Sequence, residues 1–517
     1  NMKLNDITLE LKSGRKIVKN LTFTLNQNDK LAIIGEEGNG KSTLLKYVYD
    51  EKLIESYCYY SGVNDCSKEQ IGYLEQFLNP FWYSYGALDY IISPNAGEEP
   101  NYELYNKIYQ IETLFKTYNL NLSILNNNQI IQTLSGGEKI KLQLIKILLY
   151  EPELILLDEP TNDIDLDTIL LLENFIKTTS TPIIFVSHDE ELLANTANII
   201  LHLEQIKRKT EMKFTLLKTD YSSYIDLRSR ALIQQNKDAY RTRKEKEDKR
   251  QNLMHQHLLV ENDLDRAVRQ PGWGSILAKK MKNIKSMEKK LEKMPVVDYA
   301  QPEEAINAFF NPDVIFPNGK TLLELKNFTL SVENRMLSSA IHLKFVGPKH
   351  ICIIGKNGCG KTTLIRHFYQ LLKNRTDLKL GFMPQNYEDE LEIDLTPVAY
   401  LQTFMGYDKE IKSRIMSCLA AMNFQAFEME NKIQNLSGGQ KAKLFLMKMI
   451  LLEYNVLLLD EPTRNLSPLS NPVIRKILKN YNGAIIAVSH DRKFLKEIAE
   501  EIYELTENGL HLKNEFI

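Results

Sequence analysis

Short runs of apolar residues recur along the chain, and glycine-rich or acidic residues follow them. Runs of four β-branched and leucine residues are typical of strands in a parallel sheet that is covered on both faces. The clearest runs occupy residues 31–34, 154–157 and 183–186, and then 351–354, 456–459 and 485–488. An amphipathic stretch with helical spacing follows the first run of each set. The pattern therefore predicts α/β domains built around parallel sheets.

The same blocks of sequence occur twice. Leu-Ser-Gly-Gly begins at Leu134 and Leu436, Leu-Leu-Asp-Glu-Pro-Thr at Leu156 and Leu458, and Val-Ser-His-Asp at Val186 and Val488, with an offset of 302 residues each time. Because three blocks keep one register, the sequence predicts two copies of one domain. We expect the first copy over residues 1–215, the second over residues 301–517, and a helical linker over residues 216–300.

A glycine-rich loop follows the first apolar run of each copy and precedes a helix. The loops read Gly35-Glu-Glu-Gly-Asn-Gly-Lys-Ser-Thr43 and Gly355-Lys-Asn-Gly-Cys-Gly-Lys-Thr-Thr363. Glycines in this context let backbone N–H groups close on phosphate oxygens, the lysine reaches the β- and γ-phosphates, and the next hydroxyl ligates Mg²⁺. ATP and Mg²⁺ are therefore the predicted cofactors. The expected loop residues are Gly35, Gly38, Gly40, Lys41, Ser42 and Thr43, and Gly355, Gly358, Gly360, Lys361, Thr362 and Thr363.

Acidic residues follow a later apolar run in both copies, as Asp158-Glu159 and Asp460-Glu461. The carboxyl ends of parallel strands meet at one edge of a sheet, so these side chains face the loops. The first carboxylate suits Mg²⁺ through water. The second suits activation of the attacking water, because phosphoryl transfer depends on positioning and charge neutralisation. We predict ATP hydrolysis, with Glu159 and Glu461 as catalytic residues.

A histidine ends the next apolar run of each copy. His188 and His490 are placed to contact the γ-phosphate and are predicted as catalytic residues. A purely structural role for either ring remains the alternative. The repetition at one offset favours the role at the phosphate.

These motifs resemble the ATP-binding cassette superfamily over both copies, outside the central segment. The resemblance implies that Gln76 and Gln385 are Q-loop glutamines and that the two Leu-Ser-Gly-Gly blocks bind nucleotide through Ser135, Gly136 and Gly137, and through Ser437, Gly438 and Gly439. It also implies that Mg²⁺ is bound, partly through water, by Ser42, Gln76, Asp158, Thr362, Gln385 and Asp460.

The resemblance further implies a head-to-tail sandwich within a monomer. Site one would join the loop of Lys41 to the signature Ser437-Gly438-Gly439, and site two would join the loop of Lys361 to the signature Ser135-Gly136-Gly137. Hydrolysis would couple to opening and closing of the two copies.

Two departures from the family pattern leave questions open. Neither Leu11-Lys-Ser-Gly14 nor Ser331-Val-Glu-Asn334 offers an aromatic ring for adenine, so ATP and GTP are not distinguished. The second copy has Ser467 where the first has Asp165, so equivalence of the two sites also stays open.

Composition excludes several protein classes. With 43% hydrophobic and 26% charged residues, the 517-residue chain is neither disordered nor collagen-like. No apolar run approaches the ~18 residues of a membrane helix. The five cysteines are odd in number and scattered, which fits free thiols in the cytoplasm and no cysteine-based metal site.

Positive charge is concentrated in residues 221–295, which hold 18 Lys and Arg against 10 Asp and Glu, a net of +8. Leu277, Met281, Ile284, Met287, Leu291 and Met294 recur there at helical spacing. We expect an antiparallel helical hairpin whose first arm is about 65 Å long. The break is expected at Gln270-Pro-Gly-Trp-Gly274, with residues 255–262 as the alternative turn.

The charge of this hairpin has two interpretations. It is either a solvated helix face or an RNA-binding surface with a tip formed by Arg266, Arg269 and Trp273. Basic arms with an aromatic tip suit phosphate backbones and exposed bases, and the junction of two cassettes favours the RNA interpretation.

Two cassettes joined by a charged linker, without membrane helices, resemble the ABC-F proteins, which are translation factors. The resemblance implies the 70S ribosome as partner, with contacts to 23S rRNA and P-site tRNA, the cassettes at the tRNA exit site, and the linker directed at the peptidyl-transferase centre.

The segment Asp460-Glu-Pro-Thr-Arg-Asn-Leu-Ser-Pro468 is similar to the antibiotic-resistance branch of this group. The spans from Gln76 to Ser135 and from Gln385 to Ser437, 59 and 52 positions, leave no room for the arm of housekeeping members. The resemblance implies ribosome protection, in which the linker tip displaces antibiotics. A housekeeping ABC-F factor acting on stalled ribosomes and an ATPase subunit of a transporter remain alternatives.

Overall fold

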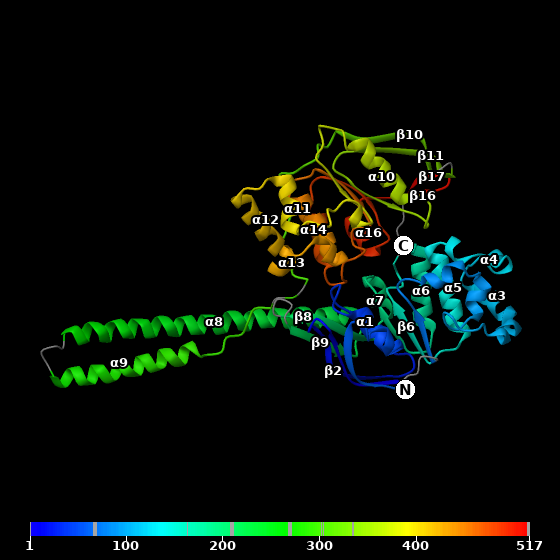
Figure 1. Ribbon diagram of the computed structural model, residues 1–517. Coiled ribbons are helices and arrows are strands. Elements are labelled where there is room, and N and C mark those ends of the chain that lie inside the picture. The colour runs from blue at the N-terminus through cyan, green and yellow to red at the C-terminus, as the bar shows by residue number, and fades with distance from the viewer. Residues whose placement is uncertain are drawn as a thin grey trace. The chain divides into compact units, whose positions relative to one another are not determined.

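The computed structural model describes residues 2–65, 70–162, 164–206, 211–266, 271–300, 302, 304–332 and 335–513 (Figure 1). The chain forms two compact units. One comprises Asn1–Tyr221 with Glu303–Ile517, and the other is Ser222–Pro302. The predicted α/β class, with two cassettes and a helical hairpin between them in the chain, is confirmed. No described helix combines the length and the apolar character that crossing a membrane requires.

Each copy is centred on a six-stranded sheet with the same strand order. The first sheet runs β5 (Ile71–Leu74), β6 (Leu154–Asp158), β7 (Ile183–Val186), β3 (Lys30–Ile34), β8 (Ile199–Ile206) and β9 (Glu211–Leu217). The second runs β13 (Leu380–Met383), β14 (Val456–Asp460), β15 (Ala484–Val488), β12 (His350–Ile354), β16 (Glu501–Thr506) and β17 (Gly509–Lys513). Only the last pair of each sheet is antiparallel. The apolar runs are thus buried parallel strands.

Smaller antiparallel sheets begin each copy. They are β2 (Lys16–Leu25), β1 (Met2–Leu11) and β4 (Cys58–Asn64) in the first copy, and β10 (Thr321–Val332) with β11 (Arg335–Val346) in the second. The α-helices of the first copy are α1 (Lys41–Tyr49), α2 (Ala87–Ile92), α3 (Ile108–Thr117), α4 (Leu122–Asn126), α5 (Gly136–Leu149), α6 (Leu166–Thr178) and α7 (Glu190–Thr196). Those of the second are α10 (Lys361–Leu372), α11 (Pro397–Met405), α12 (Lys409–Ala421), α13 (Ala426–Glu430), α14 (Gly438–Leu451), α15 (Asn471–Lys479) and α16 (Arg492–Ile498). Short 3₁₀ turns lie at Glu51–Leu53, Pro80–Ser84, Tyr102–Lys107, Ile131–Thr133, Tyr387–Asp389 and Ile433–Asn435.

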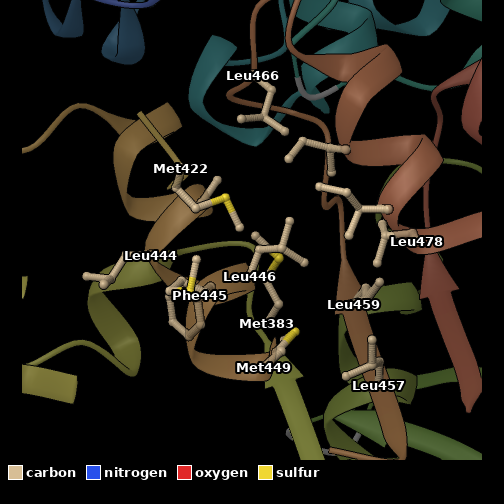
Figure 2. Packing of buried hydrophobic residues seen from close by; sticks show 14 of the residues in the cluster. Met383, Met422, Leu444, Phe445, Leu446, Met449, Leu457, Leu459, Leu466 and Leu478 are labelled. Atoms are coloured by element: carbon tan, nitrogen blue, oxygen red, sulfur yellow. The ribbon is translucent and has the colours of Figure 1, made fainter. Parts of the chain in front are cut away.

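The core of the second copy forms where α14 packs on the sheet (Figure 2). Leu446 and Met449 of α14 lie against Leu457 and Leu459 of β14, and all four are at most 5% exposed. Full burial of one such side chain is worth about 1.5–3 kcal/mol. This packing fixes both the start of α14 and the end of β14, which carry candidate site residues.

The second unit is an antiparallel pair of helices, α8 (Tyr221–Arg266) and α9 (Pro271–Glu292) (Figure 1). At 46 residues, α8 is about 70 Å long. Leu277 and Ile284 of the predicted apolar stripe are buried, whereas Met287 is exposed. His257 of α8 contacts Glu288 of α9 at 2.9 Å. The part of the stripe that includes Leu277 and Ile284 therefore faces the partner helix, as the spacing predicts, and Met287 does not.

The hairpin turn differs in detail from the sequence expectation. Residues 255–262 lie inside α8, so the alternative turn is wrong. The Pro-Gly-Trp-Gly segment forms the first turn of α9 and not the break itself, because a proline at the first helical position loses no intrahelical hydrogen bond. Arg266, the last residue of α8, and Trp273, in the first turn of α9, are exposed, and Arg269 and Gln270 lie outside the described residues.

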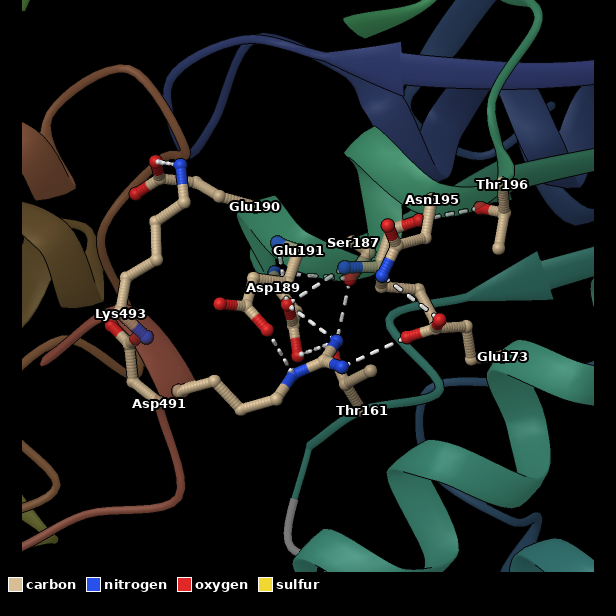
Figure 3. Close-up of polar contacts among 12 residues, drawn as sticks. Thr161, Glu173, Ser187, Asp189, Glu190, Glu191, Asn195, Thr196, Asp491 and Lys493 are labelled. Carbon is tan, nitrogen blue, oxygen red and sulfur yellow. Dashed lines mark hydrogen bonds and ion pairs between the residues drawn. The ribbon is translucent and has the colours of Figure 1, made fainter. Parts of the chain in front are cut away.

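Ion pairs join the two copies where α7 faces α16 (Figure 3). Arg475, 2% exposed, donates from both terminal nitrogens to the Glu190 carboxylate, with the shorter bond at 2.6 Å. Arg492, 5% exposed, donates to Glu173 at 2.9 Å and to Asp189 at 3.3 Å. The acidic groups belong to the first copy and the basic groups to the second.

We predict that Arg475→Ala destabilises the protein by about 2–3 kcal/mol, because Glu190 loses its buried guanidinium partner and keeps only Lys493, 2.9 Å away in a side chain that is 34% exposed. Lys496→Ala is the matched control. Its pair with Glu191, 2.8 Å long, has a lysine that is 47% exposed and should contribute about 1 kcal/mol or less. Urea unfolding followed by far-UV circular dichroism measures both. Equal losses in the two variants would contradict a stabilising role for the buried pair.

Candidate nucleotide sites

The two glycine-rich loops connect the central strands β3 and β12 to helices α1 and α10. Gly35 has φ 143°, and a Cβ there would lie 2.3 Å from the Leu203 carbonyl oxygen, so the loop requires glycine. Lys41 Nζ donates to the carbonyl oxygens of Gly35 at 2.9 Å and Glu36 at 3.1 Å. Lys361 makes the same two bonds in the second copy. Each lysine amine is thus held across its own loop, at the start of a helix where phosphate binds.

A hydroxyl–carboxylate pair lies beside the first loop. Ser42 Oγ donates to Asp158 Oδ1 at 2.9 Å, and the Tyr73 hydroxyl donates to the other oxygen at 3.3 Å. Burial, followed by the charge of Glu159, raises the pKa of Asp158 to about 6. A buried carboxylate disfavoured as an anion, next to a hydroxyl, is a donor set that fits Mg²⁺.

The same fit holds in the second copy. Asp460 is 1% exposed, and neither of its carboxylate oxygens accepts a hydrogen bond that meets ordinary geometry within the described part of the chain. Burial raises its pKa, which the neighbouring Thr362 hydroxyl and Lys361 oppose. A bound cation would satisfy these oxygens.

Glu159 is held by three polar groups. It accepts from Gln76 Nε2 at 2.8 Å and Asn162 Nδ2 at 2.7 Å, and His188 Nε2 lies 3.1 Å from its other oxygen. Burial alone would raise its pKa, but His188, with Lys41 and Asn162, lowers it to about 2. Gln76, predicted as a Mg²⁺ ligand, thus contacts the catalytic candidate and not Asp158.

Glu461 has a different environment. His490 Nε2 is 3.8 Å away, and the His490 backbone N–H donates to Glu461 at 3.3 Å. Burial, followed by the charge of Asp460, raises the pKa of Glu461 to about 8. Burial, followed by Lys361, lowers the pKa of His490 to about 3. The repeated residues are in place in both copies, but their electrostatics differ.

Both catalytic candidates have an unusual backbone. Glu159 has φ 49° and Glu461 has φ 52°, in the left-handed region that side chains other than glycine seldom adopt. Such strain persists where the surrounding structure enforces it and clusters at functional sites. Other described non-glycine residues share this conformation, among them Glu151 (φ 49°) and Glu453 (φ 53°), so the backbone agrees with the assignment but does not make it alone.

Residues of both copies line a cavity of about 740 Å³. The second copy contributes its loop, including Lys361 and Thr362, together with Gln385. The first copy contributes Ser135 and Gly136 from the start of α5. The volume lies within the range of small-molecule sites, ~300–1,000 Å³. The arrangement is that expected for site two.

The signature glycines lie at helix starts. Ser135 caps α5 and Ser437 caps α14, each in a capping box. Gly137 has no room for a side chain, since a Cβ would lie 2.9 Å from Thr168 Oγ1. In site one, the Gly439 N–H donates to the carboxylate of Glu37, a residue of the first loop. The loop and the opposite signature are therefore in contact there as well.

Sequence reasoning missed residues that strands bring to the cavity. Val332, Arg335 and Leu337 line it from the ends of β10 and β11. Residues 331–334 contain no aromatic side chain. A guanidinium group can stack on a planar base. Arg335, which an apolar residue follows, was therefore the one feature of the sequence that could have indicated a base-binding residue here.

Comparison with known proteins is consistent with this geometry. The family described as ABC transporter matches residues 18–162 and 339–464. ATP-binding protein Uup of Buchnera aphidicola subsp. Acyrthosiphon pisum is 30% identical over 514 residues, 96% of this chain and 79% of that protein. The putative ATP-binding protein YdiF of Bacillus subtilis is 28% identical, over 96% and 78% of the two chains. ABC transporter F family member 5 of Arabidopsis thaliana is 30% identical over 74% of this chain and 53% of that protein.

Solved structures share the fold. The archaeal ribosome recycling factor aABCE1, in complex with the stalk protein aP1, has a TM-score of 0.55 at 14% identity, covering 98% of this chain and 89% of that one. RNase-L Inhibitor has a TM-score of 0.52 at 14% identity, covering 94% and 86%. At this identity the likeness is one of fold.

The two catalytic candidates should respond oppositely to conversion into glutamine. Because the folded pKa of Glu461, about 8, exceeds the ordinary 4.5, the folded state retains a proton there and loses stability as pH rises from 4.5 to 8. Glu461→Gln should therefore raise the melting temperature more at about pH 7.5 than at about pH 5.5. Glu159, with its pKa lowered to about 2, stabilises the fold above pH 4.5. Glu159→Gln should therefore lower the melting temperature at both pH values. Scanning calorimetry without nucleotide and with EDTA measures this. A Glu461→Gln shift that does not grow with pH would refute the assignment.

Proposed function

Since this chain belongs to the ATP-binding cassette family and, within it, to the ABC-F proteins, we propose that it is an ATPase that acts on the ribosome. It binds the 70S ribosome at the tRNA exit site, with contacts to 23S rRNA and P-site tRNA. Its hairpin tip reaches the peptidyl-transferase region and displaces antibiotics there. The observation that carries this proposal is the hairpin itself, a long basic pair of helices in a chain whose two cassettes already account for the ATP chemistry.

The surface of α9 supports RNA as the partner. Its apolar stripe packs toward α8, and its lysines are exposed: Lys279, Lys280, Lys282, Lys285, Lys289 and Lys290. The helix holds only two acidic residues, Glu288 and Glu292. Exposed cations on a rigid rod gain affinity for a phosphate backbone through counterion release. Trp273, 52% exposed near the turn, adds a ring on which a base can stack.

In the proposed reaction, Glu159 and Glu461 orient and activate the attacking water, and His188 and His490 contact the γ-phosphate. Lys41 and Lys361 bind the β- and γ-phosphates. Ser42 and Asp158 hold Mg²⁺ in site one, and Thr362 and Asp460 hold it in site two. When bound, Mg²⁺ neutralises charge on the phosphates.

We predict that the double variant Glu159→Gln/Glu461→Gln binds ATP but has almost no steady-state hydrolysis, because an amide keeps the shape but cannot polarise water. With ATP trapped, the closed protein should sediment with 70S ribosomes in a sucrose gradient, whereas Lys41→Ala/Lys361→Ala should not. Near-normal turnover would refute the catalytic assignment. A trapped protein that stays at the top of a low-salt gradient would refute the ribosome as partner.

A second prediction separates the hairpin tip from the ATP sites. Deleting residues 268–275, or combining Trp273→Ala with Arg269→Ala, should remove antibiotic protection and leave basal ATP hydrolysis unchanged. The matched control is Met287→Ala, because Met287 is 54% exposed on the same helix but lies away from the turn. Drug-susceptibility assays of expressing cells, with ATPase rates of the purified proteins, measure both effects. Retained resistance in the deletion would mean that the tip has no role at the drug site.

The two alternatives give different outcomes in these assays. A housekeeping ABC-F factor would sediment with ribosomes but leave drug susceptibility unchanged when expressed. A transporter ATPase subunit would follow the membrane fraction. The first outcome would correct only the proposal that the protein displaces antibiotics. The second would overturn the proposal that it acts on the ribosome.

A further inference from the structure

The two glycine-rich loops differ at four positions, and at two of them the charge differs. The first loop has Glu36 and Glu37 where the second has Lys356 and Asn357. A residue that follows the Asp-Glu-Pro-Thr motif also differs, since Ser467 in the second copy stands where the first has Asp165. Both differences meet at the contact between the copies.

Glu36 crosses from the first loop to the second copy. One of its carboxylate oxygens accepts hydrogen bonds from Ser467 Oγ at 2.6 Å and Ser470 Oγ at 2.5 Å. Lys443 Nζ, in a side chain that is 8% exposed, lies 3.6 Å from the other oxygen. Burial alone would raise the pKa of Glu36, but Lys443 and the two serines lower it to about 2, so the group is a carboxylate.

Glu37 accepts a hydrogen bond from a backbone N–H group that a bound phosphate would otherwise use. Its carboxylate accepts from the backbone N–H of Gly439, in the first turn of α14. First-turn N–H groups have no partner within the helix and carry its partial positive charge. A Cβ built on Gly438 or Gly439 would lie 3.2 Å or 3.4 Å from a Glu37 carboxylate oxygen, so the fit is close. A γ-phosphate and this carboxylate compete for one donor.

At site two the carboxylate of the equivalent contact does not belong to the glycine-rich loop but to the opposite copy. There the carboxylate belongs to Asp165, which accepts from the backbone of Asn357 in the second loop. Asn357 is neutral and lines the 740 Å³ cavity together with Ser135 and Gly136 of the opposite signature. No carboxylate of the second loop competes for the start of α5, because Lys356 and Asn357 occupy the two positions.

We propose that Glu36 and Glu37 form a carboxylate clasp that makes the two nucleotide sites unequal. Site two is preformed and binds ATP first. ATP enters site one only when Glu37 leaves the start of α14, and the Glu36 contacts hold the two copies together until then. This inference rests on nucleotide binding at the two loops and does not depend on the ribosome.

The test measures ATP binding to purified protein by isothermal titration calorimetry with Mg²⁺, in the Glu159→Gln/Glu461→Gln background that prevents turnover. The expected isotherm has a tight and a weak site, about tenfold or more apart in Kd. Lys361→Ala should remove the tight site and Lys41→Ala the weak one. Two equal sites in the parent protein would overturn the proposal.

Exchanging the loop residues provides the matched pair. Glu37→Asn should tighten the weak site about tenfold and leave the tight site unchanged, whereas Asn357→Glu should weaken the tight site by a similar factor. Glu37→Gln, which keeps the length of the side chain, covers the case in which Glu37→Asn fails to fold. An unchanged weak site in a folded variant without the Glu37 charge would overturn the clasp. Because ribosomes are absent, a failed ribosome assay leaves this result unaffected.

Discussion

The arrangement of the two copies depends on two buried arginines that pair with carboxylates of the opposite copy, although Arg475 also contacts Glu497 of its own copy at 2.9 Å. Arg475 and Arg492 come from the second copy, and Glu173, Asp189 and Glu190 come from the first. Two duplicated domains have similar surfaces, so apolar contact alone would not choose between pairing unlike copies and pairing like ones. Buried charges do choose, because an unpaired ion in the interior costs several kcal/mol. Pairing of two first copies would bring carboxylates together, and pairing of two second copies would bring guanidinium groups together. The buried charges therefore favour the pairing of unlike copies.

This contact also lies next to the chemistry. Asp189 and Glu190 directly follow His188, and Asp491 and Arg492 directly follow His490. A change in the spacing of α7 and α16 therefore moves the residues beside both histidines. The copies share a scaffold but not their electrostatics, since Glu159 is held as an anion by its neighbours while burial favours the protonated form of Glu461.

Local features were predictable from the sequence. The strands, the glycine-rich loops and the helix starts follow from short-range patterns, because burial of a whole strand requires a continuous apolar run and a tight loop requires glycine. The helical spacing of the apolar residues from Leu277 to Ile284 likewise predicted that this helix packs against a second helix. The contacts of Glu36, Glu37 and Arg475 join residues more than 280 positions apart, and nothing in their local sequence distinguishes them from surface charges. The break between the two helices was predictable only in part, because a Pro-Gly pair can end one helix or begin the next.

The hairpin closes on itself at its base. Ala300 donates its backbone N–H to Asn236 Oδ1 at 2.9 Å, and Lys246 donates to the carbonyl oxygens of Glu292 and Met294, so the returning chain follows α8 back toward the residues where it departed. A long insertion therefore behaves as a short tether. The effective concentration of one copy for the other stays high and independent of how much protein a cell contains. Association of the copies is then a unimolecular step, which contacts too weak to hold separate subunits together can still control.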